Sequence, residues 1–251
     1  QHIGKPAVPA IEVGATVKRG QLIGKADGFV SANVHASVAG TVKAVEERSD
    51  GKGGTGVHVV ISCGETDETD FMPPLADASA EEIAQRIQDA GIVGMGGAGF
   101  PTSVKIKPRI KVDTLILNGA ECEPYLNCDN RIMLEQRDQI VRGAKYLAKA
   151  IGVENIIIGI ERNKPAAIAT FEETDLNVVT LKKQYPMGSE KHLIYCCTKR
   201  KVPLGGLPAD AGVIVQNVMT ALAVCEAVEE GKPLIERVVT VSGAGVNTPK
   251  N

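Results

Sequence analysis

The strongest constraint on the fold is an alternation of short apolar runs with amphipathic segments through the second half of the chain. The apolar runs have the length and the Val, Ile and Leu content of buried strands, and they lie at 112–119, 154–161, 177–182 and 212–217. The segments between and after them have helical patterns, at 131–152, 164–173, 189–200 and 218–231. Because parallel strands need crossover connections, this alternation predicts an α/β domain with a mostly parallel sheet and helices on both faces.

Residues 1–66 have a different pattern, in which short alternating apolar and polar runs end at glycine or Asp-Gly. Such runs are typical of strands joined by tight turns, so we predict a small all-β barrel-sandwich domain. Two of them, "VGATVKRGQLIG" and "SVAGTVKAV", resemble biotinyl and lipoyl carrier domains, which present a modified lysine at a hairpin tip. Here Lys25 comes too early, and Asn33 lies near the expected tip. We therefore expect a structural or positioning role for this domain.

The boundary between the two domains follows from local composition. Residues 67–79 are acidic and contain adjacent prolines, which is typical of a linker. Ser79 and Glu82 then have the spacing of a helix capping box, and Gly91 would end that helix.

The α/β domain is expected to span 80–237. Residues 238–251 begin a new β pattern and then stop, so we interpret them as the start of a truncated β-grasp module. The chain also opens with Gln1 rather than Met, and we expect a fragment or a processed chain.

Composition argues against several functional classes. A net charge of −2, 3% aromatic residues and no Trp do not favour nucleic acid as a partner. The longest apolar runs are too short to span a bilayer, and no signal peptide opens the chain. The six cysteines include no CxxC pair and the four histidines are scattered, so we expect reduced thiols and no metal site within this chain.

The glycine-rich stretch "GIVGMGGAGFPTSVK", residues 91–105, is the first candidate for chemistry. It matches neither the Walker loop nor the dinucleotide GxGxxG motif. Glycines permit a tight turn, and they also let backbone N–H groups approach a phosphate or a flat ring. Lys105 would neutralise such an anion. From the glycines alone, the turn and the ligand cradle are equally good interpretations.

Polar residues also follow three of the predicted strands, where ligands bind in open α/β sheets. The segments are "NGAECEPY" at 118–125, "YPMGSEKHL" at 185–193 and "IVQNVMT" at 214–220. Each has a simpler explanation. The acids after the first strand would be solvated, Glu190 would complement a helix dipole, and Asn217 would be an N-cap. Their occurrence at successive strand ends nevertheless predicts one shared site.

These residues carry a resemblance to a known family. The patterns "GxGGAGFPT…K", "NxAExEP", "YxxGxExxLI" and "QNVxT" together resemble the flavin- and NADH-binding subunit of respiratory complex I. The amino-terminal segment is more specific, and the chain resembles the RnfC subunit of the Rnf ion-translocating electron transport complex over essentially all 251 residues. The alternative is the related cobalamin reductase of propanediol-utilisation microcompartments.

The resemblance implies an FMN held without a covalent bond and NADH as substrate. Hydride would pass between the nicotinamide and the flavin, so no side chain is named as a catalytic acid or base. The positions implied to bind NADH are Phe100, Glu123 and Glu190. Those implied to bind FMN are Gly94, Gly96, Gly97, Ala98, Lys105, Asn118, Glu121, Gly188, Asn217 and Thr220.

The resemblance also implies the setting of the protein. It would be a peripheral subunit on the cytoplasmic face of the bacterial cell membrane, with the other Rnf subunits as partners and ferredoxin as an indirect one. Two [4Fe-4S] clusters are expected only in the missing carboxyl-terminal part. Met95 and Ala120 stand where complex I relatives usually carry Arg and Asp, which indicates a less charged pocket. The carboxylate of Glu190 would repel a 2′-phosphate and so favour NADH over NADPH.

Overall fold

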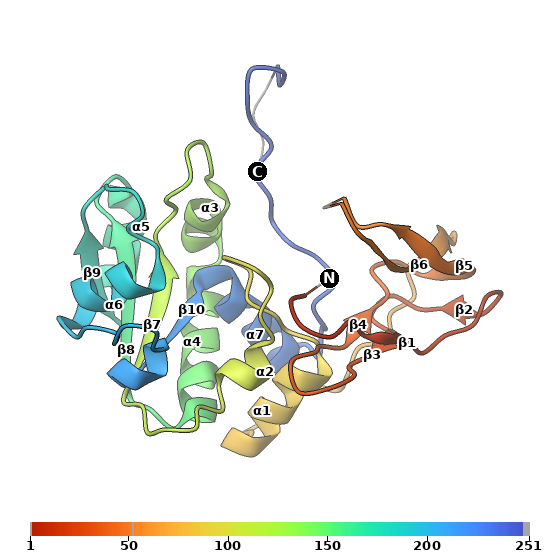
Figure 1. Ribbon diagram of the computed structural model, residues 1–251, viewed down its shortest axis with the longest axis horizontal. Coiled ribbons are helices and arrows are strands. Elements are labelled where there is room, and N and C mark those ends of the chain that lie inside the picture. Colours follow the sequence, from red (N-terminus) through yellow and green to blue (C-terminus); the bar gives the residue numbers. More distant parts are fainter. Residues whose placement is uncertain (1, 52, 248–251) are drawn as a thin grey trace.

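A computed structural model of the chain describes residues 2–51 and 53–247. It has a β domain, drawn in red and orange in Figure 1, and an α/β domain that holds most of the helices. The carboxyl-terminal segment leaves the α/β domain and extends away from both (Figure 1).

The β domain consists of two antiparallel three-stranded sheets, ordered β1-β3-β4 and β2-β5-β6. Its strands are β1 (Val8–Pro9), β2 (Thr16–Val17), β3 (Leu22–Lys25), β4 (Val34–His35), β5 (Gly40–Ser49) and β6 (Thr55–Cys63). Small and β-branched residues fill the space between the sheets, namely Val17, Ile23, Ala36 and Val42. This is the all-β sandwich that the glycine-punctuated runs predict.

The α/β domain is built on one four-stranded sheet, ordered β10-β7-β8-β9, in which every pairing is parallel. Its strands are β7 (Thr114–Gly119), β8 (Asn155–Glu161), β9 (Asn177–Leu181) and β10 (Val213–Asn217). Alternate residues of β7 enter different cores, Leu115 and Leu117 on one face and Ile116 on the other. Both faces are therefore buried, as expected for a parallel sheet.

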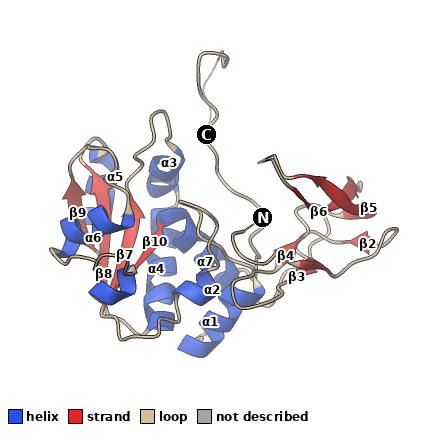
Figure 2. Cartoon of the chain, in the orientation of Figure 1, coloured by secondary structure: helices blue, strands red, loops and turns tan. Residues whose placement is uncertain are grey.

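Helices cover both faces of this sheet (Figure 2). The core of one face includes residues from α1, α3, α4, α5 and α7, whereas α6 covers the other. The helices are α1 (Ala80–Asp89), α2 (Thr102–Lys105), α3 (Cys128–Glu135), α4 (Arg137–Ile151), α5 (Pro165–Glu172), α6 (Glu190–Thr198), the 3-10 helix η1 (Pro208–Ala211) and α7 (Val218–Glu229). The mixed architecture of a β domain and a parallel α/β domain is thus confirmed.

One predicted helix is wrong in its extent. The single helix expected at 131–152 is two helices, α3 and α4, separated at Gln136, whose φ of −126° and ψ of 27° are not helical. No glycine or proline marks this break in the sequence. The cause lies in tertiary packing, because α3 packs against α5 and α7, whereas α4 packs along α7 and contacts α1.

The two helix N-caps predicted from the sequence, Ser79 and Asn217, are both present. Ser79 and Glu82 form the reciprocal capping box at the start of α1, and the Asn217 side chain accepts from the Met219 N–H at the start of α7. Ser189 occupies the N-cap position of α6, but its side chain makes no capping hydrogen bond and instead contacts His192.

Hydrogen bonds hold the two domains together through the predicted linker and the predicted tip. Within 67–79, the Met72 N–H donates to the Gly231 carbonyl at 3.0 Å. The Asn33 side chain donates to the Asp89 carbonyl at the end of α1, at 3.2 Å. Asn33 is therefore packed against the α/β domain, which agrees with a positioning role for the β domain.

Beyond α7, residues 230–247 form no further helix or named strand. The β-grasp start proposed at 238–251 stays a prediction, and residues 248–251 lie outside the described part of the chain. Among the described residues, no helix combines the length and the apolar character needed to cross a bilayer.

Candidate cofactor-binding site

Four loops at the carboxyl edge of the sheet enclose two adjoining cavities. The glycine-loop cavity, of about 350 Å³, lies against the loop between α1 and α2. The acidic cavity, of about 590 Å³, lies against the loop that follows β7. Both volumes are in the range of small-molecule sites. The two cavities share one wall, made of Gly96, Asn118, Gly188, Ser189 and Asn217.

The structure brings together all the residues that the sequence singles out. The acidic cavity is lined by Glu121 and Glu123, and Thr220 lines neither cavity but accepts from the Met95 N–H at 3.1 Å. The remaining predicted residues line the glycine-loop cavity, namely Gly94, Gly96, Gly97, Ala98, Phe100, Lys105, Asn118, Gly188, Glu190 and Asn217. The convergence of the strand ends on one site is thus as expected, while the contacts of each residue with a ligand stay a prediction.

The glycine loop is both a tight turn and a bare cavity wall. The Gly94 N–H donates to the Phe100 carbonyl at 2.8 Å and closes the loop on itself. A Cβ atom at Gly96 would lie 3.1 Å from Asn217 Nδ2, so this glycine lets two loops approach closely. A Cβ atom at Gly97 would meet nothing within 4 Å. Gly97 therefore presents backbone, without a side chain, to the open cavity.

Two asparagines cross-link the loops. Asn118 Nδ2 donates to the Gly188 carbonyl at 2.9 Å, and its Oδ1 accepts from the Ala120 N–H at 3.1 Å. Asn217 Nδ2 donates to Asp129 Oδ2 at 2.8 Å, while its Oδ1 caps α7. The N-cap explanation for Asn217 is therefore correct, and the residue lines both cavities as well. These amides position the wall through bonds within the protein.

The acids of the site differ in their surroundings. Glu121 has a buried carboxylate that accepts from the Asp129 N–H at 2.8 Å and from the Asn130 N–H at 3.2 Å. Glu123 is exposed and lines the same acidic cavity. Burial raises the pKa of Asp129 to about 6, with the nearby Glu121 charge acting in the same direction, against the hydrogen bond from Asn217. Part of the negative charge beside the acidic cavity is therefore titratable near neutral pH.

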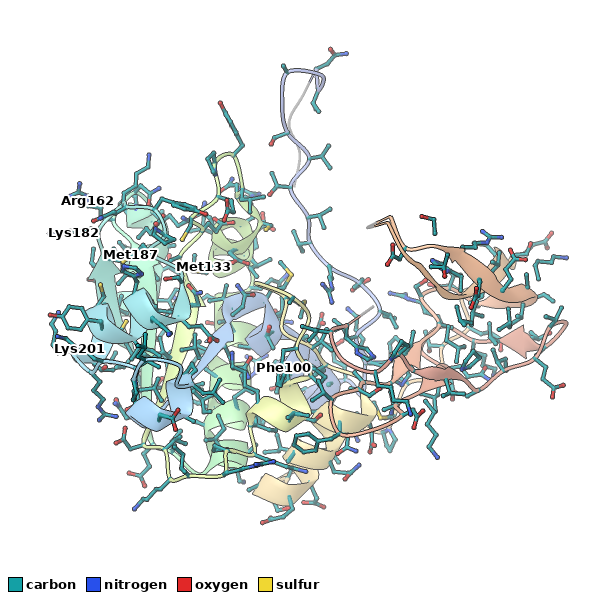
Figure 3. The ribbon with its side chains drawn as sticks, viewed as in Figure 1. Phe100, Met133, Arg162, Lys182, Met187 and Lys201 are labelled. Atoms are coloured by element: carbon teal, nitrogen blue, oxygen red, sulfur yellow. The ribbon has the colours of Figure 1, made fainter. Side chains whose placement is uncertain are left out.

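Lys105 and Glu190 form an ion pair across the glycine-loop cavity, joining α2 to the first turn of α6. Phe100, labelled in Figure 3, comes from the loop before α2 and is 38% exposed. An aromatic ring, a cation and a carboxylate thus all line this cavity. Such a set can bind a flat ring that carries hydroxyl and phosphate groups.

Sequence reasoning left two parts of the site out of its binding set. Gln216 lines the glycine-loop cavity, and its buried Nε2 has no hydrogen-bond partner among the described residues. Its place beside Asn217 in "QNVxT" was a usable signal. The segment 237–240, which lines the acidic cavity, carried no such signal. Thr240 anchors it by accepting from the Asn127 N–H at 3.0 Å.

Three side chains near the acidic cavity have metal-ligand types, and the ligand atoms of Glu121, Cys128 and Asp129 lie within 4.8 Å of one another. However, both oxygens of Glu121 already accept backbone N–H groups, and Asp129 accepts from Asn217. This arrangement does not favour a cation over the hydrogen bonds already made. The six cysteines are free thiols.

The residues present fit a flat anionic cofactor of the FMN type. An unpartnered amide donor, a cation and side-chain-free backbone all line one cavity, through Gln216, Lys105 and Gly97. A buried donor without a partner is costly, and a ligand acceptor would satisfy it. The second, larger cavity beside the shared wall leaves room for a co-substrate.

Two family models match the chain. Residues 87–226 match the Nuo51 FMN-binding domain, and residues 1–66 match the RnfC barrel sandwich hybrid domain. The first match contains the glycine loop and all the strand ends of the site.

Curated relatives match over the whole chain. The C subunit of the proton-translocating ferredoxin:NAD(+) oxidoreductase complex of Clostridium ljungdahlii is 48% identical, covering 100% of this chain and 57% of the relative. Its Na(+)-translocating counterpart in Acetobacterium woodii is 46% identical, covering 99% of this chain and 59% of the relative. The corresponding protein of the Pseudomonas aeruginosa ion-translocating oxidoreductase complex is 42% identical, covering 100% of this chain and 34% of the relative. The chain thus spans less than two thirds of each relative, and these names give no support to the cobalamin reductase alternative.

A solved structure has a similar fold over part of the chain. The NAD+-reducing [NiFe]-hydrogenase in its H2-reduced state aligns with a TM-score of 0.50 at 26% identity, covering 60% of this chain and 31% of that one. Its air-oxidised state aligns equally well, at 28% identity. Taken with the two domain matches and the full-chain identities, this places the chain in a family: it belongs to the RnfC family, the C subunits of the Rnf ion-translocating oxidoreductase complexes.

Proposed function

We propose that this chain is the FMN- and NADH-binding part of a membrane-associated complex that moves electrons between NADH and ferredoxin, coupled to ion translocation. The observation that carries the proposal is the pair of adjoining cavities around one glycine loop, within the segment that matches an FMN-binding domain. One cavity suits the cofactor and the other its nicotinamide partner. The names of the relatives support NAD and ferredoxin as the redox partners.

In this proposal the residues of the chain bind and orient the cofactor and the dinucleotide, and none of them transfers a proton. Gly97 and its neighbours give the cofactor access to backbone, Gln216 donates a hydrogen bond, and Lys105 balances the phosphate charge. Glu123 lines the acidic cavity, which is the space for the dinucleotide, and Phe100 would contact the dinucleotide from the adjoining glycine-loop cavity. Bound FMN would exchange two electrons with a nicotinamide and single electrons with iron–sulfur clusters.

The iron–sulfur clusters belong, in this proposal, to the part of the relatives that this chain does not span. The chain alone would then take up FMN and pass electrons from NADH only to artificial acceptors. In the cell it would be a peripheral subunit on the cytoplasmic face of the membrane, bound to the other Rnf subunits.

The test is a titration of the purified chain with FMN, in which binding is measured by the quenching of FMN fluorescence and by calorimetry. Saturable, stoichiometric quenching is the expected result. If folded protein takes up no FMN, the proposed function fails, and a scaffold whose glycine loop only shapes the chain becomes the better explanation.

Selectivity for NADH over NADPH rests on Glu190. Its carboxylate would accept ribose hydroxyls and repel a 2′-phosphate, and it also neutralises Lys105. In Glu190→Ala, Lys105 becomes an unpaired cation, so binding of NADPH should improve relative to NADH. Glu154→Ala, a change at an exposed glutamate just before β8, is the matched control. Equal binding of both dinucleotides by the wild type, or no relaxation in Glu190→Ala, would contradict this role.

A further inference from the structure

Behind the wall of the acidic cavity lie three buried charges. Lys164 Nζ is 3.5 Å from Glu121 Oε2 and 3.5 Å from Glu161 Oε2. The side chains of Lys164, Glu121 and Glu161 are only 8%, 3% and 4% exposed. The three come from neighbouring parts of the sheet edge, with Glu161 ending β8, Lys164 preceding α5 and Glu121 following β7.

Charges buried to this extent are costly, and a buried cation between two buried acids offsets part of that cost by its attraction to both. Lys164 is the only cation within ion-pair distance of either acid among the described residues. Removal of Lys164 would therefore leave two buried carboxylates without a counter-charge, and this electrostatic cost would favour displacement of a carboxylate.

Glu121 is the member of the trio that faces the site, because it lines the acidic cavity. Its carboxylate accepts two backbone N–H groups in the first turn of α3, those of Asp129 and Asn130. A negative charge at this end of a helix is favourable. The carboxylate of Glu121 thus connects the trio to α3.

From α3 the connection continues to the wall that both cavities share. Asp129, in the first turn of α3, accepts from Asn217 Nδ2. Asn217 in turn lies against Gly96 of the glycine loop. A displacement of the Glu121 carboxylate would therefore shift α3, Asn217 and the glycine loop with it. Lys164 itself lines neither cavity.

We propose that Lys164 is a positioning residue for the cofactor site, which acts through Glu121 by holding its carboxylate in place against the first turn of α3. This rests on the proposed function, since the ligand of the site is taken to be FMN. Glu161 is the second counter-charge of Lys164 and has no direct role in the site.

The experiment measures FMN affinity by fluorescence quenching, and thermal stability without FMN, for a set of variants. Lys164→Met should weaken FMN binding about tenfold, a coupling typical of residues in one polar network. Lys164→Arg, which keeps the charge, should restore the affinity to within about threefold. Lys145→Met, which breaks the exposed pair of Lys145 with Asp175, is the matched control and should bind as the wild type does.

A double-mutant cycle separates positioning from a general structural role. If Lys164 acts through Glu121, Lys164→Met should have little further effect on FMN affinity in a Glu121→Gln background. An undiminished effect there, or a loss of stability with unchanged FMN affinity, overturns the proposal. If Lys164→Met does not fold, the same cycle is run with Lys164→Gln, which keeps a hydrogen-bond donor without the charge. Wild-type protein that binds FMN while Lys164 variants match it refutes only this inference, whereas wild-type protein that does not bind FMN refutes the proposed function as well.

Discussion

The sharpest test of the glycine-loop cavity is the substitution Gly97→Val. Gly97 lines this cavity, its φ lies outside the left-handed region, and a Cβ atom there would meet no protein atom within 4 Å. The protein itself therefore has room for the valine side chain. A ligand seated against the loop does not, because the side chain would project into the space that the ligand needs.

The expected effects on stability and on binding have opposite signs. Replacing glycine at a compatible backbone position reduces the entropy of the unfolded chain and stabilises by about 0.4–1 kcal/mol. Extra methyl groups in an occupied, well-packed space cost about 1–3 kcal/mol. The latter corresponds to a rise in the Kd for FMN of about 5- to 150-fold. Gly97→Val should thus melt at or slightly above the wild-type temperature and bind FMN much more weakly.

The assay is thermal unfolding of the ligand-free protein together with FMN titration. Gly56→Val is the matched control, since Gly56 also has open space around its Cβ position but lies on β6 of the β domain. It should leave FMN affinity unchanged. An unaltered Kd in Gly97→Val would refute the placement of the ligand against this loop. A large loss of stability would refute the open space that the geometry indicates.

Three further outcomes follow from other parts of the structure. Burial raises the pKa of Asp129 from 3.8 to about 6, so ionisation costs the folded state on the order of 3 kcal/mol. The free energy of unfolding of the wild type should therefore fall relative to that of Asp129→Asn as pH rises from about 4 to about 6, with no further change above pH 6. If denaturant titrations show the same difference in unfolding free energy at every pH, this prediction is contradicted. Gly143→Ala should destabilise the protein by about 2–3 kcal/mol and lower Tm by roughly 5–10 °C. The reason is that the new Cβ would lie 1.8 Å from the Ala221 carbonyl oxygen, where α4 meets α7. An unchanged Tm in calorimetry would show that the two helices can move apart at no cost. Iodoacetamide should alkylate the exposed Cys63 but spare Cys225, whose pKa burial raises to about 12, and equal labelling by mass spectrometry would argue against that burial.

The order and type of the elements in the α/β domain follow from local pattern, and here the prediction and the structure agree closely. The four apolar runs are the four strands of the sheet, because alternate residues such as Leu115 and Ile116 must satisfy two separate cores. The break at Gln136 was missed because no local residue requires it. It results from the different partners of α3 and α4, and such contacts between distant segments are not encoded in a single helical pattern.

The residues of the site could be found from the sequence, but their individual roles could not. Polar residues at strand ends must meet at one edge of a parallel sheet, so their convergence was predictable. Whether a given amide or carboxylate faces the cavity or a neighbouring loop depends on side-chain geometry. Glu121 accepts hydrogen bonds from the backbone of α3, and Thr220 accepts one from the backbone of the glycine loop. Gln216, which was left out of the predicted set, has a side-chain donor with no partner among the described residues.

This division of roles explains how so many short loops can form one binding site. Loops without internal helices or strands would lose conformational entropy on binding a ligand, and that loss would weaken affinity. Here the cross-links of Asn118 and Asn217 order the loops before any ligand arrives. The groups left over for a ligand are then few, mainly Gln216 and bare glycine backbone, while Lys105 is already paired with Glu190. Because the cross-links belong to the wall that both cavities share, they order the cofactor cavity and the co-substrate cavity with the same bonds.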